Sequence, residues 1–413
     1  MSLKTDLPSR FLYLDSIRAL AAIYVVMHHI SLMYLGFSPT NLTGLRSLFI
    51  KSFSYGHLSV DWFIVLSGFS LMLAVVKNND ILKGGTLLFF KRRITRIIPP
   101  YYATLFLCLI MIWLFIGNDT GTLWDNCIHI TYFDVLSHII MLHDFFSSTA
   151  SSISYSLWSI SVEFRIYLLF PLLVWIWRKK GFFFTLGFSV SFVVVGTILL
   201  IYAKDHYSEV SLISSGVCPY LILFTLGMLT AEVCFSQSRM AISVRNIYNK
   251  LSLRIIIIFL TIYVIIYQSA SILIKSTNSN SEVAFFITQQ IKDILVGVFA
   301  AFFLFTCSLT NSSDKNIFWV FKVLRWQPLV FIGTFSYSLY LIHPLLIQLI
   351  SQYVLKPFQF SNMVNTYILL VIGTPLIVAA SYLFFLLFER PFLKSGTKNI
   401  KAIAINTINE PAP

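Results

Sequence analysis

The chain has 413 residues, of which 57% are hydrophobic and only 11% are charged. In soluble globular proteins roughly a quarter of all residues are charged, so this composition excludes an ordinary soluble, fibrous or disordered chain. It predicts an all-α integral membrane protein that is embedded in the lipid bilayer. The formal net charge is +13. In a membrane protein this excess indicates basic loops on the cytoplasmic side, and no nucleic-acid partner is expected.

Apolar stretches long enough to cross a bilayer recur along the whole chain. A hydrocarbon core of about 30 Å requires roughly 20 apolar residues in each helix. About ten transmembrane helices are predicted on this basis, over residues 12–36, 57–76, 98–117, 155–177, 182–203, 217–235, 254–274, 284–309, 328–351 and 366–389. The five Cys residues include no Cys-x-x-Cys pair, so neither a zinc site nor any other metal site is expected from them.

The distribution of basic residues predicts the orientation of these helices. With the N-terminus in the cytoplasm, the alternating connections place most of the 30 Lys and Arg residues on the cytoplasmic side. Both termini are then cytoplasmic. The connection 118–154 carries Asp but no Lys or Arg, so we expect it to fold over the outer mouth, partly as an amphipathic helix. We expect one membrane domain over 1–395, a short cytoplasmic tail over 396–413 and no soluble C-terminal domain.

Ionisable residues inside the predicted spans are costly and therefore point to function. In the first span, Arg18 and His29 are eleven residues apart. At about 100° per residue they share one helix face, with His29 about 16 Å further along the helix. At about 1.5 Å per residue, Glu163 and His343 come to nearly the same depth as His29. Residues gathered at one depth suit a general base with an orienting partner. The alternative is a buried polar network that only stabilises the packing of the helices.

The connection before the third predicted span holds the densest positive charge. Segment 90–102 reads FKRRITRIIPPYY and brings Lys91, Arg92, Arg93 and Arg96 within six residues. Arg guanidinium groups bind phosphate oxygens in bidentate fashion, so a phosphate site is one interpretation. Attachment to anionic lipid headgroups is the other.

Six short motifs occur in a fixed order along nearly the whole chain. They are Arg-(x)10-His at Arg18 and His29, Ser-Gly-Phe from Ser67 to Phe69, Arg-x-x-Arg at Arg93 and Arg96, Trp-Ser-(x)3-Glu from Trp158 to Glu163, Ser-Tyr-(x)2-Tyr-Leu-x-His from Ser336 to His343, and FERP at 388–391. In this order and spacing, the chain resembles the acyltransferase-3 family of integral membrane acyltransferases.

The resemblance implies an activity and a location. The expected enzyme is an O-acyltransferase of the bacterial inner membrane. It would move an acetyl group from cytoplasmic acetyl-CoA, used as a co-substrate, to a hydroxyl of an envelope carbohydrate, with lipopolysaccharide O-antigen as the expected acceptor. Ten helices with buried charges would equally suit a transporter or flippase of a polysaccharide precursor. Against that alternative, no inverted repeat and no paired broken helices are found in the sequence.

The resemblance also assigns roles to residues. His29 is the expected catalytic base, oriented by Glu163, with Arg18 and His343 as further catalytic candidates. His29 as a covalent acceptor of the acetyl group is the alternative route. The coenzyme A phosphates are expected at Arg93 and Arg96, helped by Arg92. Ser67, Tyr337 and Arg18 are candidate donors to the thioester oxygen. Asp61 and Trp158 are expected to face the acceptor. The alternatives are that Asp61 only caps its helix and that Trp158 belongs to the interfacial aromatic belt.

Overall fold

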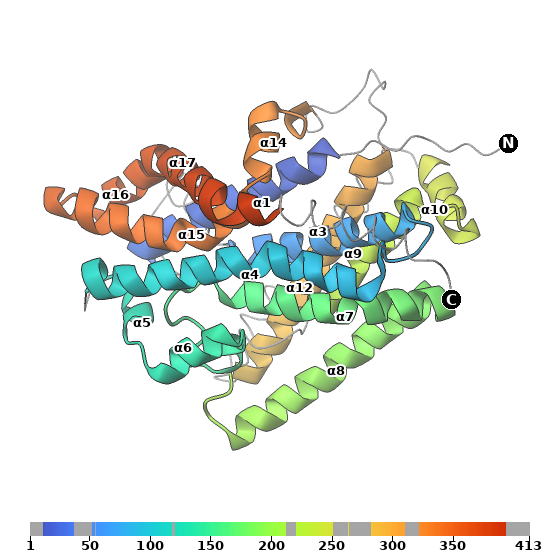
Figure 1. Ribbon diagram of the computed structural model, residues 1–413, viewed down its shortest axis with the longest axis horizontal. Coiled ribbons are helices and arrows are strands. Elements are labelled where there is room, and N and C mark those ends of the chain that lie inside the picture. The colour runs from blue at the N-terminus through green and yellow to red at the C-terminus, as the bar shows by residue number, and fades with distance from the viewer. Residues whose placement is uncertain are drawn as a thin grey trace, which may run out of the picture.

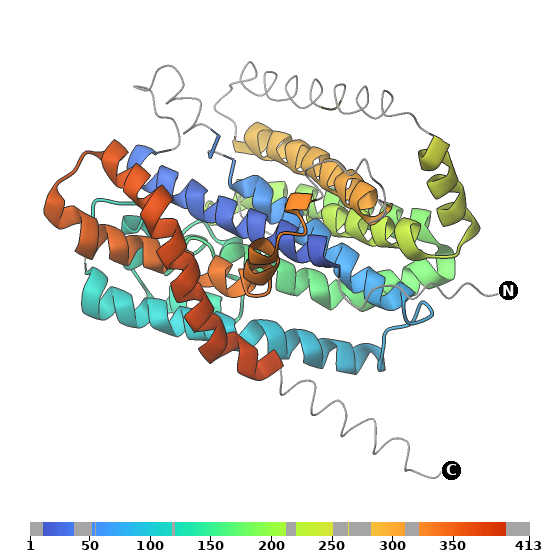
Figure 2. The same cartoon turned by 90° about the horizontal axis from the view of Figure 1, so that it is seen from above.

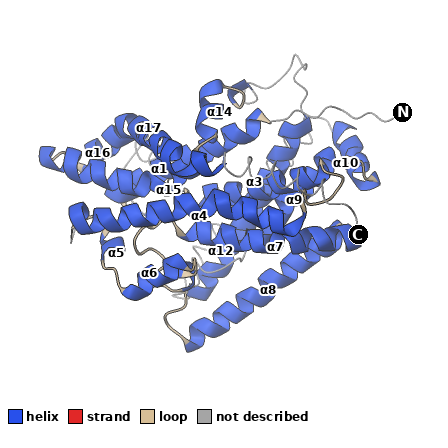
Figure 3. Cartoon of the chain, in the orientation of Figure 1, coloured by secondary structure: helices blue, strands red, loops and turns tan. Residues whose placement is uncertain are grey.

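The computed structural model describes residues 11–36, 52–53, 55–117, 120–211, 220–250, 263, 282–309 and 322–393. Within these residues the chain is all-helical, with one isolated β-bridge between Phe146 and Val210 and no sheet (Figure 3). Eight of the described helices are long and apolar enough to cross a membrane, and a ninth span results if a bent helix pair is counted as one. The prediction of an all-α membrane protein is thus confirmed.

The helices follow one another in a simple order. Six long helices are α1 (Leu12–Leu35), α3 (His57–Val76), α4 (Gly85–Met111), α7 (Trp158–Lys180), α8 (Phe182–His206) and α12 (Glu282–Leu309). The bent pair is α9 (Tyr220–Phe235) and α10 (Arg239–Lys250), which meet at 84°. The C-terminal part contains α14 (Gln327–Gly333), α15 (Ser336–Leu349), α16 (Asn362–Ile368) and α17 (Thr374–Phe384). Turns of π-helix extend several of them, at Ile112–Ile116, Ile350–Leu355, Leu369–Gly373 and Phe385–Glu389.

Three predicted spans differ from the structure. The third begins at Gly85 rather than at residue 98, so the basic run 91–96 is itself helical and Pro99 and Pro100 lie inside α4. The span predicted over 328–351 is interrupted between α14 and α15, and the tenth begins at Asn362. The span predicted over 254–274, apart from Tyr263, and the tail 396–413 lie outside the described residues.

Helices α3 and α9 approach each other closely at two glycine residues. A Cβ atom on Gly68 would lie 2.0 Å from the carbonyl oxygen of Phe224, and one on Gly227 would lie 2.1 Å from that of Val65. Such distances leave no room for any side chain, so both positions require glycine. Small residues of this kind let helix backbones approach closely inside a membrane, where the hydrophobic effect does not drive helices together. Gly68 of the Ser-Gly-Phe motif is therefore needed for the packing of α3 against α9.

Helix α1 lies in the interior of the bundle, beside α3 in both views (Figures 1 and 2). It packs against α14, where a Cβ on Gly333 would lie 2.0 Å from the carbonyl oxygen of Asp15. It also contacts α15, which brings the first and the ninth predicted spans together. Helix α8, by contrast, lies at the edge of the bundle (Figure 1), and only 17% of its most apolar stretch is buried.

The segment 120–157 packs against α4 and α7 through polar contacts. It contains α5 (Asp125–Ile128) and α6 (Tyr132–Ile139), and α6 begins with a capping box between Thr131 and Asp134. Arg165 of α7 forms a buried ion pair with Asp144, with Nη1 2.9 Å from Oδ1. The same Nη1 donates to the carbonyl oxygen of Met141 at 2.7 Å. The partly helical segment expected between the third and fourth spans is therefore present.

Candidate active site

A hollow, called here the arginine cavity, lies among α1, α3, α4, α7 and α15. Its polar lining residues are Arg18, Ser67, Ser70, Arg93, Arg96, Ser159, Glu163, Tyr167, Ser336, Tyr337 and Tyr340. Five separate helices thus contribute to one polar hollow inside an apolar bundle. Most of the site residues predicted from the motifs meet here.

The cationic side of this cavity comes from α1 and α4. Arg93 and Arg96, one helical turn apart, both line it. The guanidinium of Arg93 lies 5.9 Å from the ring centroid of Tyr167, and its Nε is buried without a hydrogen-bond acceptor among the described residues. Arg18 donates to the Ser70 hydroxyl at 2.6 Å. Arg92, in contrast, donates to the carbonyl oxygen of Lys83 at 3.0 Å and does not line the cavity, so its cofactor contact stays a prediction without support from the cavity.

Glu163 is the carboxylate of the arginine cavity. It accepts hydrogen bonds from the Ser67 hydroxyl at 2.6 Å and from the Tyr167 hydroxyl. The Tyr167 hydroxyl also lies 3.0 Å from the Ser67 oxygen. We expect Glu163 to orient His29, but its described hydrogen bonds come from Ser67 and Tyr167, and Nδ1 of His29 faces His343 instead. Equal depth along two helices does not fix which faces meet.

A second hollow, the histidine cavity, lies between α1, α3 and the segment 120–157. His28, His29, His57, Tyr155 and Trp158 line it. The ring of Trp158 stacks on that of His57, with 5.8 Å between centroids, and Tyr155 lies against His29 at 4.8 Å. Trp158, predicted to face the acceptor, therefore lines a cavity, whereas Asp61 does not line this one.

His29 and His343 form a direct pair. Nδ1 of His29 lies 2.7 Å from Nε2 of His343, and Nδ1 of His343 lies 2.7 Å from the carbonyl oxygen of Tyr340. A carbonyl oxygen only accepts, so Nδ1 of His343 carries the proton, and Nε2 of the neutral ring is an acceptor. His29 must then donate through Nδ1. This leaves the lone pair of its Nε2 available, on a side chain that lines the histidine cavity.

The two cavities adjoin one another. Val60 and Tyr340 line both of them. The Tyr340 hydroxyl is hydrogen-bonded to Ser159 at 2.7 Å, at the start of α7. A molecule reaching through the arginine cavity towards Tyr340 would therefore approach the cavity that contains His29.

Several residues that line the two cavities cannot be identified from the sequence. His57 and Tyr167 have no motif signal, because their contacts join helices far apart in the sequence. Tyr340 belongs to a motif, yet its place between the two cavities follows only from the packing of α15 against α3 and α7. Asp293 lies next to His57, where its Oδ2 is 3.4 Å from Nε2.

Comparison with known proteins gives a consistent family. The family profile described as "Acyltransferase domain" matches residues 11–386. O-acetyltransferase OatA of Staphylococcus aureus (strain NCTC 8325 / PS 47) is 28% identical over 395 residues, which cover 93% of this chain and 57% of that protein. A second protein of that species (strain COL), also named as an O-acetyltransferase, is 26% identical over 412 residues, covering 93% and 58%. The chain thus spans little more than half the length of these relatives. No solved structure matches.

Proposed function

This chain belongs to the acyltransferase-3 family of membrane proteins, and we propose that it transfers an acetyl group from acetyl-CoA to a carbohydrate hydroxyl of the cell envelope. The relatives it matches are named O-acetyltransferases. The observation that supports the reaction best is the His29–His343 pair, which presents an unprotonated imidazole nitrogen to a cavity. A general base requires such a nitrogen within reach of a hydroxyl.

The donor is proposed to occupy the arginine cavity. Arg18, Arg93 and Arg96 bring positive charge from two helices to one hollow, and coenzyme A carries several phosphate groups. Arg forks bind phosphate with good geometry, and the buried Nε of Arg93 has no acceptor of its own among the described residues. The thioester end would then extend towards Tyr340 and Val60, where the two cavities adjoin.

The acceptor is proposed to enter the histidine cavity. Tyr155 and Trp158 offer aromatic faces there, and His29 offers its nitrogen. Lipopolysaccharide O-antigen is the acceptor we propose, on the family resemblance alone. The basic run of α4 belongs on the cytoplasmic side by the positive-inside rule, so donor and acceptor would approach from opposite sides of the bacterial inner membrane. We propose a membrane domain over 1–395 for this task.

The chemical step is proposed as direct transfer. The acceptor oxygen attacks the thioester carbonyl carbon while Nε2 of His29 takes the hydroxyl proton. The tetrahedral intermediate collapses, the carbon–sulfur bond breaks, and the imidazolium of His29 returns its proton to the thiolate of coenzyme A. Arg18 is the proposed donor to the thioester oxygen, because the hydroxyl protons of Ser67 and Tyr337 are already donated to Glu163 and to the carbonyl oxygen of Ile97. His343 holds the proton on Nδ1 of His29 and is a positioning residue.

Mass spectrometry of the surface glycan tests this function. We expect acetyl esters on the glycan of a strain that expresses the protein and none in a strain lacking it. The discriminating control is purified protein in liposomes, which should consume acetyl-CoA only when an acceptor is present. Acceptor uptake without any loss of acetyl-CoA would support a transporter instead and would contradict the proposal.

A further inference from the structure

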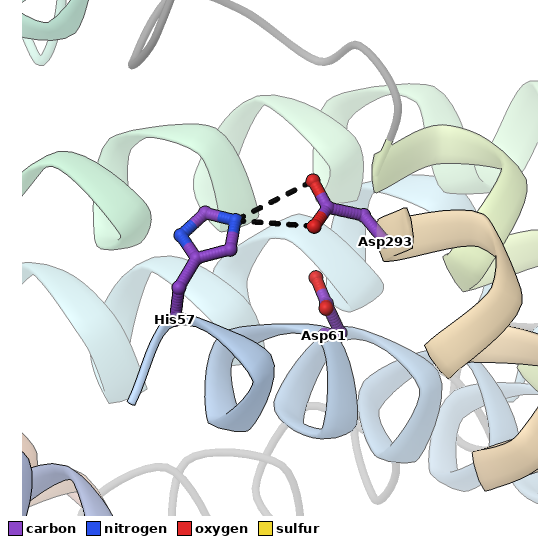
Figure 4. A group of neighbouring side chains, drawn as sticks. All are labelled: His57, Asp61 and Asp293. Carbon is purple, nitrogen blue, oxygen red and sulfur yellow. Dashed lines mark hydrogen bonds and ion pairs between the residues drawn. The ribbon is translucent and has the colours of Figure 1, made fainter. Parts of the chain in front are cut away.

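Three ionisable side chains from two helices meet in Figure 4, and one of them, His57, also lines the histidine cavity. His57 and Asp61 lie one helical turn apart on α3, and Asp293 comes from α12. One ligand atom from each residue lies within 4.8 Å of the others. Asp61 and Asp293 are 0% and 2% exposed. The proposed acetyl transfer uses none of the three.

The carboxylate of Asp61 has no hydrogen-bond partner among the residues that the structure describes, although both of its oxygens are buried. Figure 4 shows this carboxylate directed into the space between His57 and Asp293. A buried carboxylate without a partner costs several kcal/mol, and a second carboxylate nearby adds repulsion. An occupant with positive charge would remove both costs.

The geometry of the other two ligands matches a small metal ion. Nε2 of His57 lies 3.4 Å from each carboxylate oxygen of Asp293. Two ligand atoms bound at about 2.0–2.1 Å in a tetrahedral arrangement lie about 3.4 Å apart. One carboxylate oxygen of Asp61 lies within 4.8 Å of the ligand atoms of the other two residues and would have to move closer to share the ion. One imidazole nitrogen and two carboxylates suit Zn²⁺ or Mn²⁺, whereas Ca²⁺ requires six to eight oxygen ligands.

We propose that His57, Asp61 and Asp293 bind one divalent transition-metal ion that links α3 to α12. Gln289 supports the site, because its Nε2 donates to Oδ1 of Asp293 at 2.9 Å and fixes that carboxylate. His57 also lines the histidine cavity, so the ion lies in its wall and an open coordination position can take a ligand oxygen from there. The proposal rests on the geometry of these three residues and does not require the acetyl transfer proposed above.

Metal content of the purified full chain tests the proposal. The protein is isolated through a tag without histidine, stripped with a chelator, incubated with Zn²⁺ or Mn²⁺, desalted and analysed by mass spectrometry of the metal. We expect about one ion per chain, a rise in the melting temperature on binding, and at least tenfold weaker binding in Asp61→Asn and Asp293→Asn. Glu232→Gln, which changes another buried carboxylate, should keep full occupancy.

His57→Gln provides a second variant in case the Asp variants do not fold, because His57 is only partly buried. It should also lose the ion while eluting from gel filtration as the wild type does. Absence of Zn²⁺ and Mn²⁺ from the wild type, equal occupancy in the cluster variants, or binding of Mg²⁺ or Ca²⁺ alone would each overturn the assignment.

Discussion

Nδ1 of His29 and Nε2 of His343 lie 2.7 Å apart, although the two residues are separated by 314 positions in the chain. The contact exists because α1 packs against α15, with α14 seated on α1 at Gly333. Because His343 in turn donates to the carbonyl oxygen of Tyr340, the pair has a single proton arrangement when both rings are neutral. The packing of three helices thus determines which nitrogen of His29 is free.

Replacing His343 should slow the chemistry without weakening donor binding. In His343→Ala the proton on Nδ1 of His29 loses its acceptor, so the ring rotates and its tautomer is no longer held. We expect kcat to fall about 10–100-fold with little change in the KM for acetyl-CoA. His343→Gln, whose amide oxygen can accept the same proton, should recover part of kcat. Equal losses in both variants, or a change in KM alone, would contradict a positioning role.

Arg96 should contribute to donor binding through phosphate. We expect Arg96→Ala to raise the KM for acetyl-CoA about tenfold, corresponding to roughly 1.4 kcal/mol. The matched control is Arg92→Ala, which removes a neighbouring charge outside the cavity and should change the KM little. Steady-state kinetics with acetyl-pantetheine, which lacks the phosphates, should no longer distinguish Arg96→Ala from wild type. Persistence of the difference would refute the phosphate contact.

Glycine at position 68 should be required for the bundle. In Gly68→Ala the new Cβ meets the backbone oxygen of Phe224, so α3 and α9 must separate. Such overpacking typically costs about 1–3 kcal/mol. Gly187→Ala is the control, since a Cβ there has nothing within 4 Å. Thermal unfolding in detergent should show a clear loss for the first variant and none for the second, and similar melting temperatures would argue against the close packing.

Acid should destabilise the segment 120–157 through its buried histidines. The rings of His138 and His143 stack with 3.8 Å between centroids, and both residues are fully buried. Burial lowers the pKa of His138 from 6.5 to about 4 and that of His143 in the same direction. The unfolded segment therefore binds more protons than the folded one between these pH values. Stability is full above about pH 6.5 and is lost as the pH falls towards 4.

The expected loss for His138 alone is about 2 kcal/mol between pH 8 and pH 5. Hydrogen exchange of residues 132–146 at the two pH values measures it, after correction for intrinsic exchange rates. His138→Asn should be less sensitive to acid than wild type. His206→Asn changes an exposed histidine and should behave as wild type does. Identical pH dependence in all three proteins would mean that burial of His138 does not determine the acid sensitivity.

Composition and periodicity predict much of the fold but not its helix contacts. The spans over α1, α3, α7, α8 and α12 were located within a few residues, because apolar length is the dominant signal in a membrane. The basic run was not seen as part of α4, since its charges interrupt the apolar stretch while leaving the helix intact. The break between α14 and α15 has no sequence signal because both halves are apolar, and it follows directly after the close contact of Gly333 with α1.

For the candidate site too, the sequence predicts which residues are involved better than which of them are in contact. Six residues of the motifs line one cavity in the structure, namely Arg18, Ser67, Arg93, Arg96, Glu163 and Tyr337, and their roles stay predictions. The depth estimate placed His29, Glu163 and His343 at one level but did not decide which of them face each other. That depends on the rotation of α7 and α15 about their axes, which is set by long-range packing. The contact between His57 and Asp293 has no sequence signal, because it joins two helices that lie far apart in the sequence.

The most direct test of the proposed mechanism is acetyl transfer by His29→Ala in liposomes, measured with radiolabelled acetyl-CoA and a glycan acceptor at matched protein amounts. We predict that wild type and His206→Ala transfer label at equal rates, and that His29→Ala loses at least 100-fold while still binding acetyl-CoA. Transfer by His29→Ala at the wild-type rate would contradict His29 as the base.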